Sequence, residues 1–399
     1  MPCASGSTGA IKVLHVFSFF RPDFTGEGIY LEKLAVNLSG RGITSDVVVA
    51  ATQAPRVPQA VEAIGDVRFF GSRRRRAFYL NFKMAAWFAR NVGKFDVVHF
   101  HSWIDRVFLY HLIARTSARP IVQSCTLDDG LGSHVEGYRR IYRALVRRLV
   151  NLIDVNVAIS PKLYSDCLKI MPAERVTFIP QGAAIPTLDC AARSELRASW
   201  GIGADEIVLL FVGGISARKD LMFLIENHEV LASFSPRLRL IVVGPDLEDD
   251  YAAAVRQRAA ESPFGGSVSF VGYMDDPSSA YRIADVFVFA SRSEGFGNVL
   301  IEAMSFGLPV VCRRLAGVTD HFLATGVNGF LFDTSTEYVD LVKALACDSA
   351  MRTEAGNAAR QTIIERFSMD AITEKYAELY LLSAASARER RKKSSWFRR

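Results

Sequence analysis

A short apolar run, a turn with two glycines and a helical pattern follow one another within residues 285–307. The run, residues 286–290, is too short for an ordinary helix and is rich in β-branched and aromatic side chains, which favours a buried parallel strand. The turn contains Gly295 and Gly297, and apolar residues recur at three- and four-residue spacing from Asn298 onward. A strand, a turn and a helix in this order place free backbone N–H groups at the carboxyl edge of a sheet. The stretch therefore predicts an α/β fold with an anion site at this turn.

Two acidic residues accompany the turn. Glu294 lies within it, and Glu302 follows eight positions later, just over two helical turns from Glu294. Two carboxylates repel a nearby phosphate. The ligand offsets this repulsion if it also offers hydroxyl groups, which carboxylates bind through charge-assisted hydrogen bonds. A sugar ring and a ribose offer such hydroxyls, so the pair suggests a nucleotide sugar. The plainer interpretation is a solvated turn acid and a helix-surface acid, which would be the commoner case in an arbitrary chain.

Residues 294–311, EGFGNVLIEAMSFGLPVV, strongly resemble the donor-site motif of family 4 glycosyltransferases, which are retaining enzymes of the GT-B fold. The resemblance implies that Glu294 contacts the transferred sugar and has a catalytic role, and that Glu302 binds the nucleotide ribose. It also implies that backbone N–H groups of the turn meet the sugar and the phosphate. The donor-binding residues implied in this stretch are Gly295, Phe296, Gly297, Asn298, Val299 and Glu302.

Composition bounds the class of protein. The 399 residues are enough for two domains of ordinary size, and half of them are apolar, as in globular proteins. No stretch approaches the roughly 18 uninterrupted apolar residues of a membrane-spanning helix, and the N-terminus lacks the pattern of a secretory signal. The six cysteines are scattered, which favours reduced thiols in the cytoplasm over disulfides or a metal site.

The net charge of +6 is carried by residues 388–399, which hold seven basic residues and one acid. The rest of the chain is formally neutral, so nucleic-acid binding loses its support. The tail is interpreted either as a membrane anchor with Trp396 at the interface or as a solubilising disordered end. Four arginines at 73–76, followed by an aromatic-rich segment, leave a similar choice between a membrane-facing surface and a loop with a core-facing helix, and the second is favoured. The arginines within residues 139–148 form a stripe that we interpret as a solvated helix face.

The first loop of the chain contains Gly26 and Gly28, the first two glycines of a G-x-G-x-x-G dinucleotide pattern. The third position is Leu31, and the second predicted strand, residues 47–51, is not followed by the acid that a ribose would need. Nicotinamide binding is therefore disfavoured. The family resemblance instead aligns Gly26 with a glycine beside the donor diphosphate.

A second segment of the N-terminal half, residues 95–101 (FDVVHFH), reads as a strand that ends in a histidine. It resembles the family segment whose second histidine lies at the catalytic centre, which implies a catalytic role for His101. A lone histidine is more often structural, and only the register of the segment favours His101. His99 is assigned a structural role.

A basic pair, Arg218 and Lys219, follows the predicted strand at residues 207–212. Cations at a strand-to-helix turn suit a diphosphate, because each charge-assisted hydrogen bond contributes about 1.5 to 3 kcal/mol. The resemblance implies that Lys219 is the family's lysine, both catalytic and donor-binding, whereas Gly214 replaces the family's arginine. We hypothesise that Arg218 supplies the missing cation. Tyr273 falls where the family holds the nucleobase, although an aromatic side chain at a strand end often only packs.

No Asp-x-Asp motif occurs in the chain, which argues against the metal-dependent glycosyltransferases of the other main fold. We therefore expect no metal ion and no cofactor, the nucleotide sugar being a substrate.

The expected architecture is α/β, of the GT-B type, with two Rossmann-like doubly wound domains facing each other across a cleft. An acceptor-binding domain would span residues 1–186 and a nucleotide-sugar domain residues 187–367. A helix at 368–387 would cross back to the first domain, ahead of the basic tail at 388–399.

The expected reaction moves a hexose from a nucleotide sugar to a hydroxyl of a saccharide or lipid-linked acceptor, and the family resemblance alone implies retention of anomeric configuration. The expected context is bacterial polysaccharide or glycolipid biosynthesis, in the cytoplasm, with peripheral contact to the anionic inner face of the membrane left open. The alternatives are a nucleotide-sugar epimerase or hydrolase on the same fold and a non-catalytic sugar-binding homologue.

Overall fold

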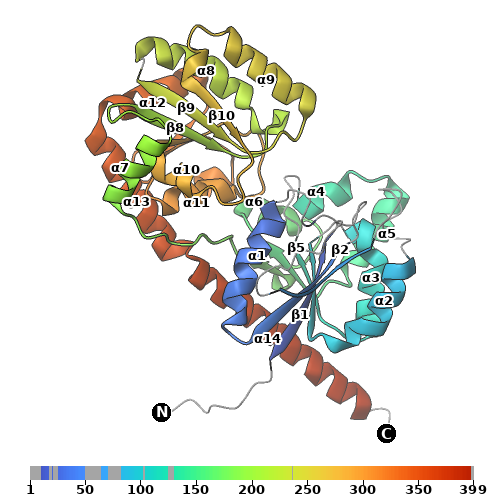
Figure 1. The fold of residues 1–399 in the computed structure, drawn as a ribbon. Coiled ribbons are helices and arrows are strands. Elements are labelled where there is room, and N and C mark those ends of the chain that lie inside the picture. Colours follow the sequence, from blue (N-terminus) through green and yellow to red (C-terminus); the bar gives the residue numbers. More distant parts are fainter. Residues whose placement is uncertain are drawn as a thin grey trace. The chain divides into compact units, whose positions relative to one another are not determined.

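The computed structural model describes residues 10–17, 20, 26–49, 64–70, 82–101, 104–124, 130–235 and 237–396. The chain forms two compact units, each built around one parallel β-sheet (Figure 1). The first unit comprises Met1–Gln181 and Met369–Arg399, and the second comprises Gly182–Ser368. Residues 182–186, expected with the first domain, thus group with the second unit.

The described part of the first unit contains a parallel sheet in the order β3-β2-β1-β4-β5-β6-β7. Its strands are β1 (Ile11–Phe17), β2 (Ile43–Val49), β3 (Ile64–Phe69), β4 (Val97–His101), β5 (Ile121–Ser124), β6 (Val155–Ala158) and β7 (Val176–Phe178). The helices between them are α1 (Gly26–Ser39), α2 (Phe82–Asn91), α3 (Ile104–Thr116), α4 (Gly130–Glu136), α5 (Arg140–Val150) and α6 (Pro161–Cys167). The strand order reverses between β1 and β4, which makes this pair the topological switch point of the sheet.

The second unit repeats the plan with the order β10-β9-β8-β11-β12-β13. Its strands are β8 (Ile207–Val212), β9 (Leu238–Val243), β10 (Val268–Gly272), β11 (Val286–Phe289), β12 (Val310–Arg313) and β13 (Phe330–Phe332). Its helices are α7 (Cys190–Ser199), α8 (Leu221–Phe234), α9 (Asp249–Glu261), α10 (Ser278–Ile283), α11 (Asn298–Ser305), α12 (Ser335–Cys347) and α13 (Ser349–Arg366). Here the switch point lies between β8 and β11.

Central strands are buried along most of their length because helices cover both faces of a parallel sheet. Every residue of β11 is buried, for example. The last helix, α14 (Met369–Trp396), belongs to the first unit, although the second unit precedes it in the chain (Figure 1). Its Tyr376 and Tyr380 are buried in the same apolar cluster as residues of β1 and β4. This burial anchors the C-terminal helix to the first sheet.

The described part of the basic tail is helical, since α14 continues to Trp396 instead of ending near residue 387. Arg388 donates to Asp96 at 2.9 Å and Arg390 to Asp154 at 3.1 Å, so part of the tail's charge is paired within the first unit. The disordered-end interpretation is therefore wrong for residues 388–396. The arginines at 73–76 and residues 397–399 lie outside the described residues. None of the described helices has an apolar stretch long enough to cross a bilayer.

Candidate active site

Two loops leave the carboxyl ends of β8 and β11 in the second unit. The loop after β8 contains the 3₁₀ turn Ala217–Lys219, and the loop after β11 leads into α11. The two strands pair in parallel although they are far apart in the chain, so both loops leave from the switch point. Ligands of open α/β sheets bind at this place.

The turn before α11 is fixed by its glycine and its aromatic residue. Gly297 has φ of 99°, in the left-handed region, and a Cβ there would come within 2.9 Å of Leu300 Cδ1. Phe296 is buried, and its ring centroid lies 5.6 Å from that of Phe322 and 6.1 Å from that of Phe367. The side chain of Phe296 is therefore part of the core, and the turn offers a ligand its backbone.

Glu294 collects three donors on one oxygen. Lys219 Nζ lies 2.6 Å from Glu294 Oε1, Ser291 Oγ lies 2.6 Å from it, and Arg218 Nη1 lies 3.0 Å from it. Glu294 Oε2 accepts from none of the described residues. The structure thus brings Arg218, Lys219 and Glu294 together and leaves one carboxylate oxygen for a ligand hydroxyl.

The charge of Glu294 is maintained against its burial. Burial alone raises the pKa of a carboxyl group, and the residue is 8% exposed. Lys219 and then Arg218 outweigh this effect, and the pKa of Glu294 lies below its ordinary value. Glu294 is therefore an anion at neutral pH. It can accept hydrogen bonds from sugar hydroxyl groups but cannot act as a proton donor.

Asp220 joins the two loops and was not among the predicted site residues. It is buried, and its carboxylate accepts from Arg292 at 2.9 and 3.0 Å and from Arg313 at 2.9 Å. The backbone adds to this link, because Arg292 N–H donates to the carbonyl of Arg218 at 2.9 Å. The position of Asp220 directly after the basic pair is a sequence signal, but its partners lie far along the chain.

The remaining predicted donor residues lie on the same edge of the second sheet or on the helix that starts there. Glu302 is half-buried in α11, and its Oε2 accepts from the buried Tyr281 hydroxyl at 3.1 Å. Tyr273 follows β10, is 47% exposed and donates to Asp275 at 3.0 Å. Val299 is half-buried in the first turn of α11. Asn298 Oδ1 is buried with no partner among the described residues, so a donor from a ligand or a water would satisfy it.

The first unit places Gly26 and His101 at its own switch point, between β1 and β4. Gly26 is the first residue of α1, and His101 is the last residue of β4. His101 Nδ1 lies 2.7 Å from Glu27 Oε1, and its ring stacks on Phe17 with 4.2 Å between centroids. Glu27, which was not predicted, requires the proton of His101 to be on Nδ1 when the ring is neutral.

A chain of histidines extends this arrangement into the core. His101 Nε2 lies 3.0 Å from His15 Nδ1, whose ring also contacts Ser45 Oγ at 3.3 Å. His99 bonds Tyr380 of α14 and Ser124, each at 2.8 Å. Burial and the neighbouring His101 hold the pKa values of His15 and His99 well below 6.5, so both rings are neutral. His99 is thus placed as a structural residue.

The same three histidines are the closest approach to a metal site among the described residues. Ring nitrogens of His15, His99 and His101 all lie within 4.8 Å of one another. Every ring nitrogen of the group already has a hydrogen-bond partner, so a metal ion would have to displace several of these bonds. The arrangement fits a hydrogen-bonded network better than a ligand set.

Comparison with known families covers both units. The family described as "Glycosyltransferase Family 4" matches residues 24–184, and the family described as "Glycosyl transferases group 1" matches residues 192–362. The chain belongs to the family 4 glycosyltransferases. The first family match includes β4 with His101, and the second includes the loops with Lys219 and Glu294.

Named relatives and solved structures agree with this membership. A D-inositol 3-phosphate glycosyltransferase of Pseudarthrobacter chlorophenolicus is 27% identical over 67% of this chain. This chain covers 66% of that relative, just under two thirds of its length. The O-antigen chain mannosyltransferase C of Escherichia coli is 24% identical over 93% of this chain and 98% of its own. The structure of Anabaena HepE in complex with UDP and glucose superposes with a TM-score of 0.75 at 21% identity, covering 92% of this chain and 99% of HepE. These matches place the fold among the GT-B glycosyltransferases.

Proposed function

We propose that this glycosyltransferase moves a hexose from a nucleotide sugar to a hydroxyl of a saccharide or lipid-linked acceptor, with retention of anomeric configuration. The contact that carries the proposal joins Lys219 Nζ to Glu294 Oε1 at 2.6 Å, at the switch point of the second sheet. It sets a cation for a diphosphate beside a carboxylate for sugar hydroxyls, at the start of a helix. Solved HepE structures contain UDP, glucose and UDP-glucose, which makes UDP-glucose the first donor to test.

The departing diphosphate sets the electrostatic demand on the site. When the bond between the anomeric carbon and the phosphate oxygen breaks, its electron pair stays on the diphosphate. Lys219 donates only to Glu294 among the described residues, so further N–H donors of its ammonium group are left for phosphate oxygens. Arg218, whose side chain is 41% exposed, and the N–H groups at the start of α11 add to the stabilisation. The acceptor oxygen then bonds to the anomeric carbon, and its proton passes to the leaving phosphate oxygen.

The acceptor is assigned to the first unit, where His101 is held by Glu27 at the carboxyl end of β4. Relatives named for O-antigen chains and inositol 3-phosphate support a role in bacterial polysaccharide or glycolipid synthesis. We propose that the protein works in the cytoplasm, where bacteria make and consume nucleotide sugars. Glu294 supports the donor electrostatically in this scheme, since its pKa keeps it ionised.

A transfer assay tests the proposal. Donor, acceptor panel and protein are incubated, nucleoside diphosphate release is measured, and the product's anomeric configuration is read by NMR. Glu294→Gln is expected to lower kcat/KM at least about a hundredfold, as loss of a preorganised charged group does. Glu226→Gln, at an exposed position of α8, is the matched control and should keep wild-type activity.

The rival activities give different results in the same assay. A hydrolase would consume the donor rapidly without an acceptor, and an epimerase would convert it to a second nucleotide sugar. Unchanged transfer in Glu294→Gln would contradict the role given to this residue. We also propose that the reaction needs no metal ion, so full activity in excess EDTA is expected, and activity that EDTA removes and magnesium restores would contradict this.

We further propose that the first unit contacts an anionic membrane through α5. Three apolar side chains of this helix are exposed, namely Ile141 at 88%, Leu145 at 51% and Tyr142 at 42%. Arginines flank them at positions 139, 140, 143, 147 and 148. An exposed apolar face bordered by arginines suits the boundary between anionic headgroups and acyl chains. The sequence interpretation of this helix as a solvated face missed the exposed apolar side chains.

A further inference from the structure

The second unit has a cavity of about 400 Å³ on the side opposite its proposed donor loops. Ala284 and Asp285, which directly precede β11, line it together with Leu308 and Pro309, which directly precede β12. The loop with Glu294 follows β11 instead. The cavity therefore lies at the amino edge of the sheet, a strand's length away from the carboxyl edge. Its volume is within the range of small-molecule sites.

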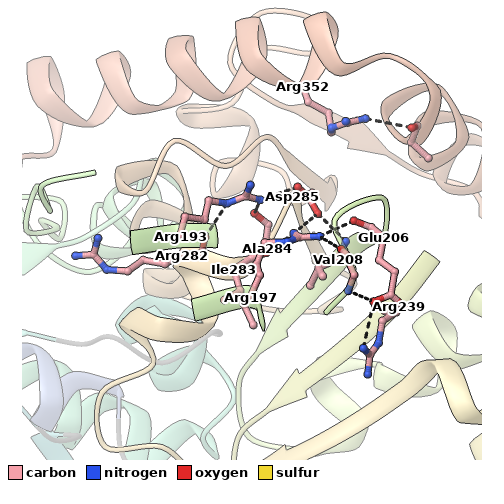
Figure 2. Close-up of polar contacts among 12 residues, drawn as sticks. Arg193, Arg197, Glu206, Val208, Arg239, Arg282, Ile283, Ala284, Asp285 and Arg352 are labelled. Carbon is pink, nitrogen blue, oxygen red and sulfur yellow. Dashed lines mark hydrogen bonds and ion pairs between the residues drawn. The ribbon is translucent and has the colours of Figure 1, made fainter. Parts of the chain in front are cut away.

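Arginines dominate the charge around this cavity. Arg193 and Arg197 of α7 both point at the carboxylate of Asp285, with nitrogen–oxygen distances of 2.7 and 2.9 Å (Figure 2). Two guanidinium groups thus share one carboxylate, and the trio keeps a positive charge. The other lining acid, Asp189, is already used as the N-cap of α7, where it accepts from two backbone N–H groups.

Two further arginines of the lining have no acidic partner among the described residues. Arg282 donates to the carbonyl of Thr187 at 2.9 Å, and its guanidinium carbon lies 5.6 Å from the ring centroid of Phe306. Arg352 donates to the carbonyls of Leu345 and Ala346 (Figure 2). Carbonyl groups orient a guanidinium without neutralising it. Both guanidinium groups therefore keep their positive charge, but they point away from each other and do not form one anion clamp (Figure 2).

The rest of the lining is apolar or hydroxylated. Leu188, Phe306 and Leu308 supply apolar surface, and Ser349 and Thr353 supply hydroxyl groups from the first turn of α13. We propose that this cavity is a second ligand site, distinct from the donor site, for a small phosphate monoester with an apolar body. The phosphate would be held by Arg282, and the body would pack on the neighbouring Phe306 and Leu188.

Tyr281 connects the cavity to the donor side of the domain. Its buried ring lines the cavity and stacks on Phe306 with 5.2 Å between centroids, while its hydroxyl donates to Glu302 at 3.1 Å. A ligand that presses on Phe306 and Tyr281 therefore shifts the position of the Glu302 carboxylate. This link, which rests on the proposed function of Glu302, makes the cavity a regulatory site.

Isothermal titration calorimetry with phenyl phosphate on the full chain tests the site. Wild-type protein is expected to bind it at millimolar concentration or below. Arg282→Gln should weaken binding at least about tenfold, because it removes the charge-assisted contact, whereas Arg352→Gln, whose guanidinium group points elsewhere, should weaken it far less. Thr353→Glu adds a negative charge to the lining at an exposed position and should also weaken binding. Thr353→Lys loses the same hydrogen bond from Thr353 Oγ1 to the carbonyl of Ser349 but should not weaken binding.

Lys219→Met separates this site from the donor site. It should bind phenyl phosphate as the wild type does, and its loss of binding would overturn the proposal by placing the anion at the donor loops. Absence of binding to the wild type, or equal binding to Thr353→Glu, would also overturn it.

UDP affinity, measured with and without phenyl phosphate, tests the link through Tyr281. A change in the wild type that disappears in Tyr281→Phe supports the link, and an unchanged UDP affinity refutes it while leaving the site in place. A failure of the proposed function would show differently, as absence of UDP binding under both conditions.

Discussion

Glu294 is buried and nevertheless ionised. Its burial opposes ionisation, and the lysine and arginine of the neighbouring loop restore it. Both cations lie on the loop after β8 and join it to the carboxylate on the loop after β11. The local chemistry of the site thus depends on two segments that are 75 residues apart in the chain.

The buried histidines of the first unit predict an acid-sensitive stability. His15 and His99 are neutral in the folded state because burial holds their pKa values well below 6.5. The unfolded chain takes up protons below its ordinary pKa of 6.5, so this contribution to stability is present above pH 6.5 and is lost as the pH falls below it. Each ring adds up to about 1.4 kcal/mol per pH unit to the slope.

Denaturant unfolding measured from pH 7.5 to pH 5.5 checks this prediction. His99→Gln should be less stable at the upper pH but should lose less stability on acidification than the wild type. Equal slopes for the two proteins would contradict the neutral, buried state assigned to His99.

Some of the site residues belong to a linear sequence motif, and others do not. Glu294, Glu302 and Lys219 stand in fixed register with glycines and apolar residues, so the sequence predicted their chemistry. Asp220 and Tyr281 act through partners that the fold supplies, and single residues of these types are too common to be informative. Arg218 lies beside Glu294, as hypothesised, although its contact with a ligand stays a prediction.

At the scale of elements, the packing of α11 against α13 depends on the absence of a side chain. A Cβ on Gly356 of α13 would lie 2.1 Å from the carbonyl oxygen of Gly307, which follows α11. Gly356→Ala should therefore push the helices apart and destabilise the second unit by about 2 kcal/mol, despite alanine's better helix propensity.

Chemical denaturation checks this prediction with Gly266→Ala as its matched control, because no atom lies within 4 Å of the added Cβ there. A Gly356→Ala protein as stable as the wild type would show that the contact is not close. The displaced α11 should also weaken donor binding through Glu302.

Helix α5 predicts how the protein binds vesicles. Ile141→Ser combined with Leu145→Ser should lower binding to vesicles containing phosphatidylglycerol at least about tenfold, since two apolar side chains no longer enter the bilayer. Ile364→Ser, an exposed apolar residue of the second unit, is the matched control. Co-sedimentation measures the effect, and equal binding of both variants would refute the assignment of this surface.

At the scale of the whole molecule, the two doubly wound sheets were expected from the family resemblance together with the strand-like runs and helical patterns. The bounds of β8 agree with the predicted strand at 207–212, and β4 ends at His101 as predicted. The edge strands β3 and β13 were not predicted. β3 carries Asp66 and Arg68, which pair with each other at 2.6 Å, and β13 has three residues, so neither shows the long apolar run of a central strand.

The tail illustrates a second limit of prediction from sequence. Its charge was readable, but its partners were not, because Asp96 and Asp154 precede separate strands of the first sheet. The high charge of residues 388–396 suggested a disordered end, and their helix propensity was overlooked. Only the fold of the first unit brings these acids to α14.

A thermal-shift panel of nucleotide sugars tests the central claim most directly, because a ligand that binds the folded state stabilises it by mass action. At a hundredfold excess over its dissociation constant, one nucleotide sugar should stabilise the second unit by about 2.7 kcal/mol and raise its unfolding temperature by roughly 5 °C or more. Lys219→Met and Glu302→Gln should each remove most of this shift, and Glu226→Gln should keep it. A panel without any shift, or a shift that both site variants retain, would contradict the account.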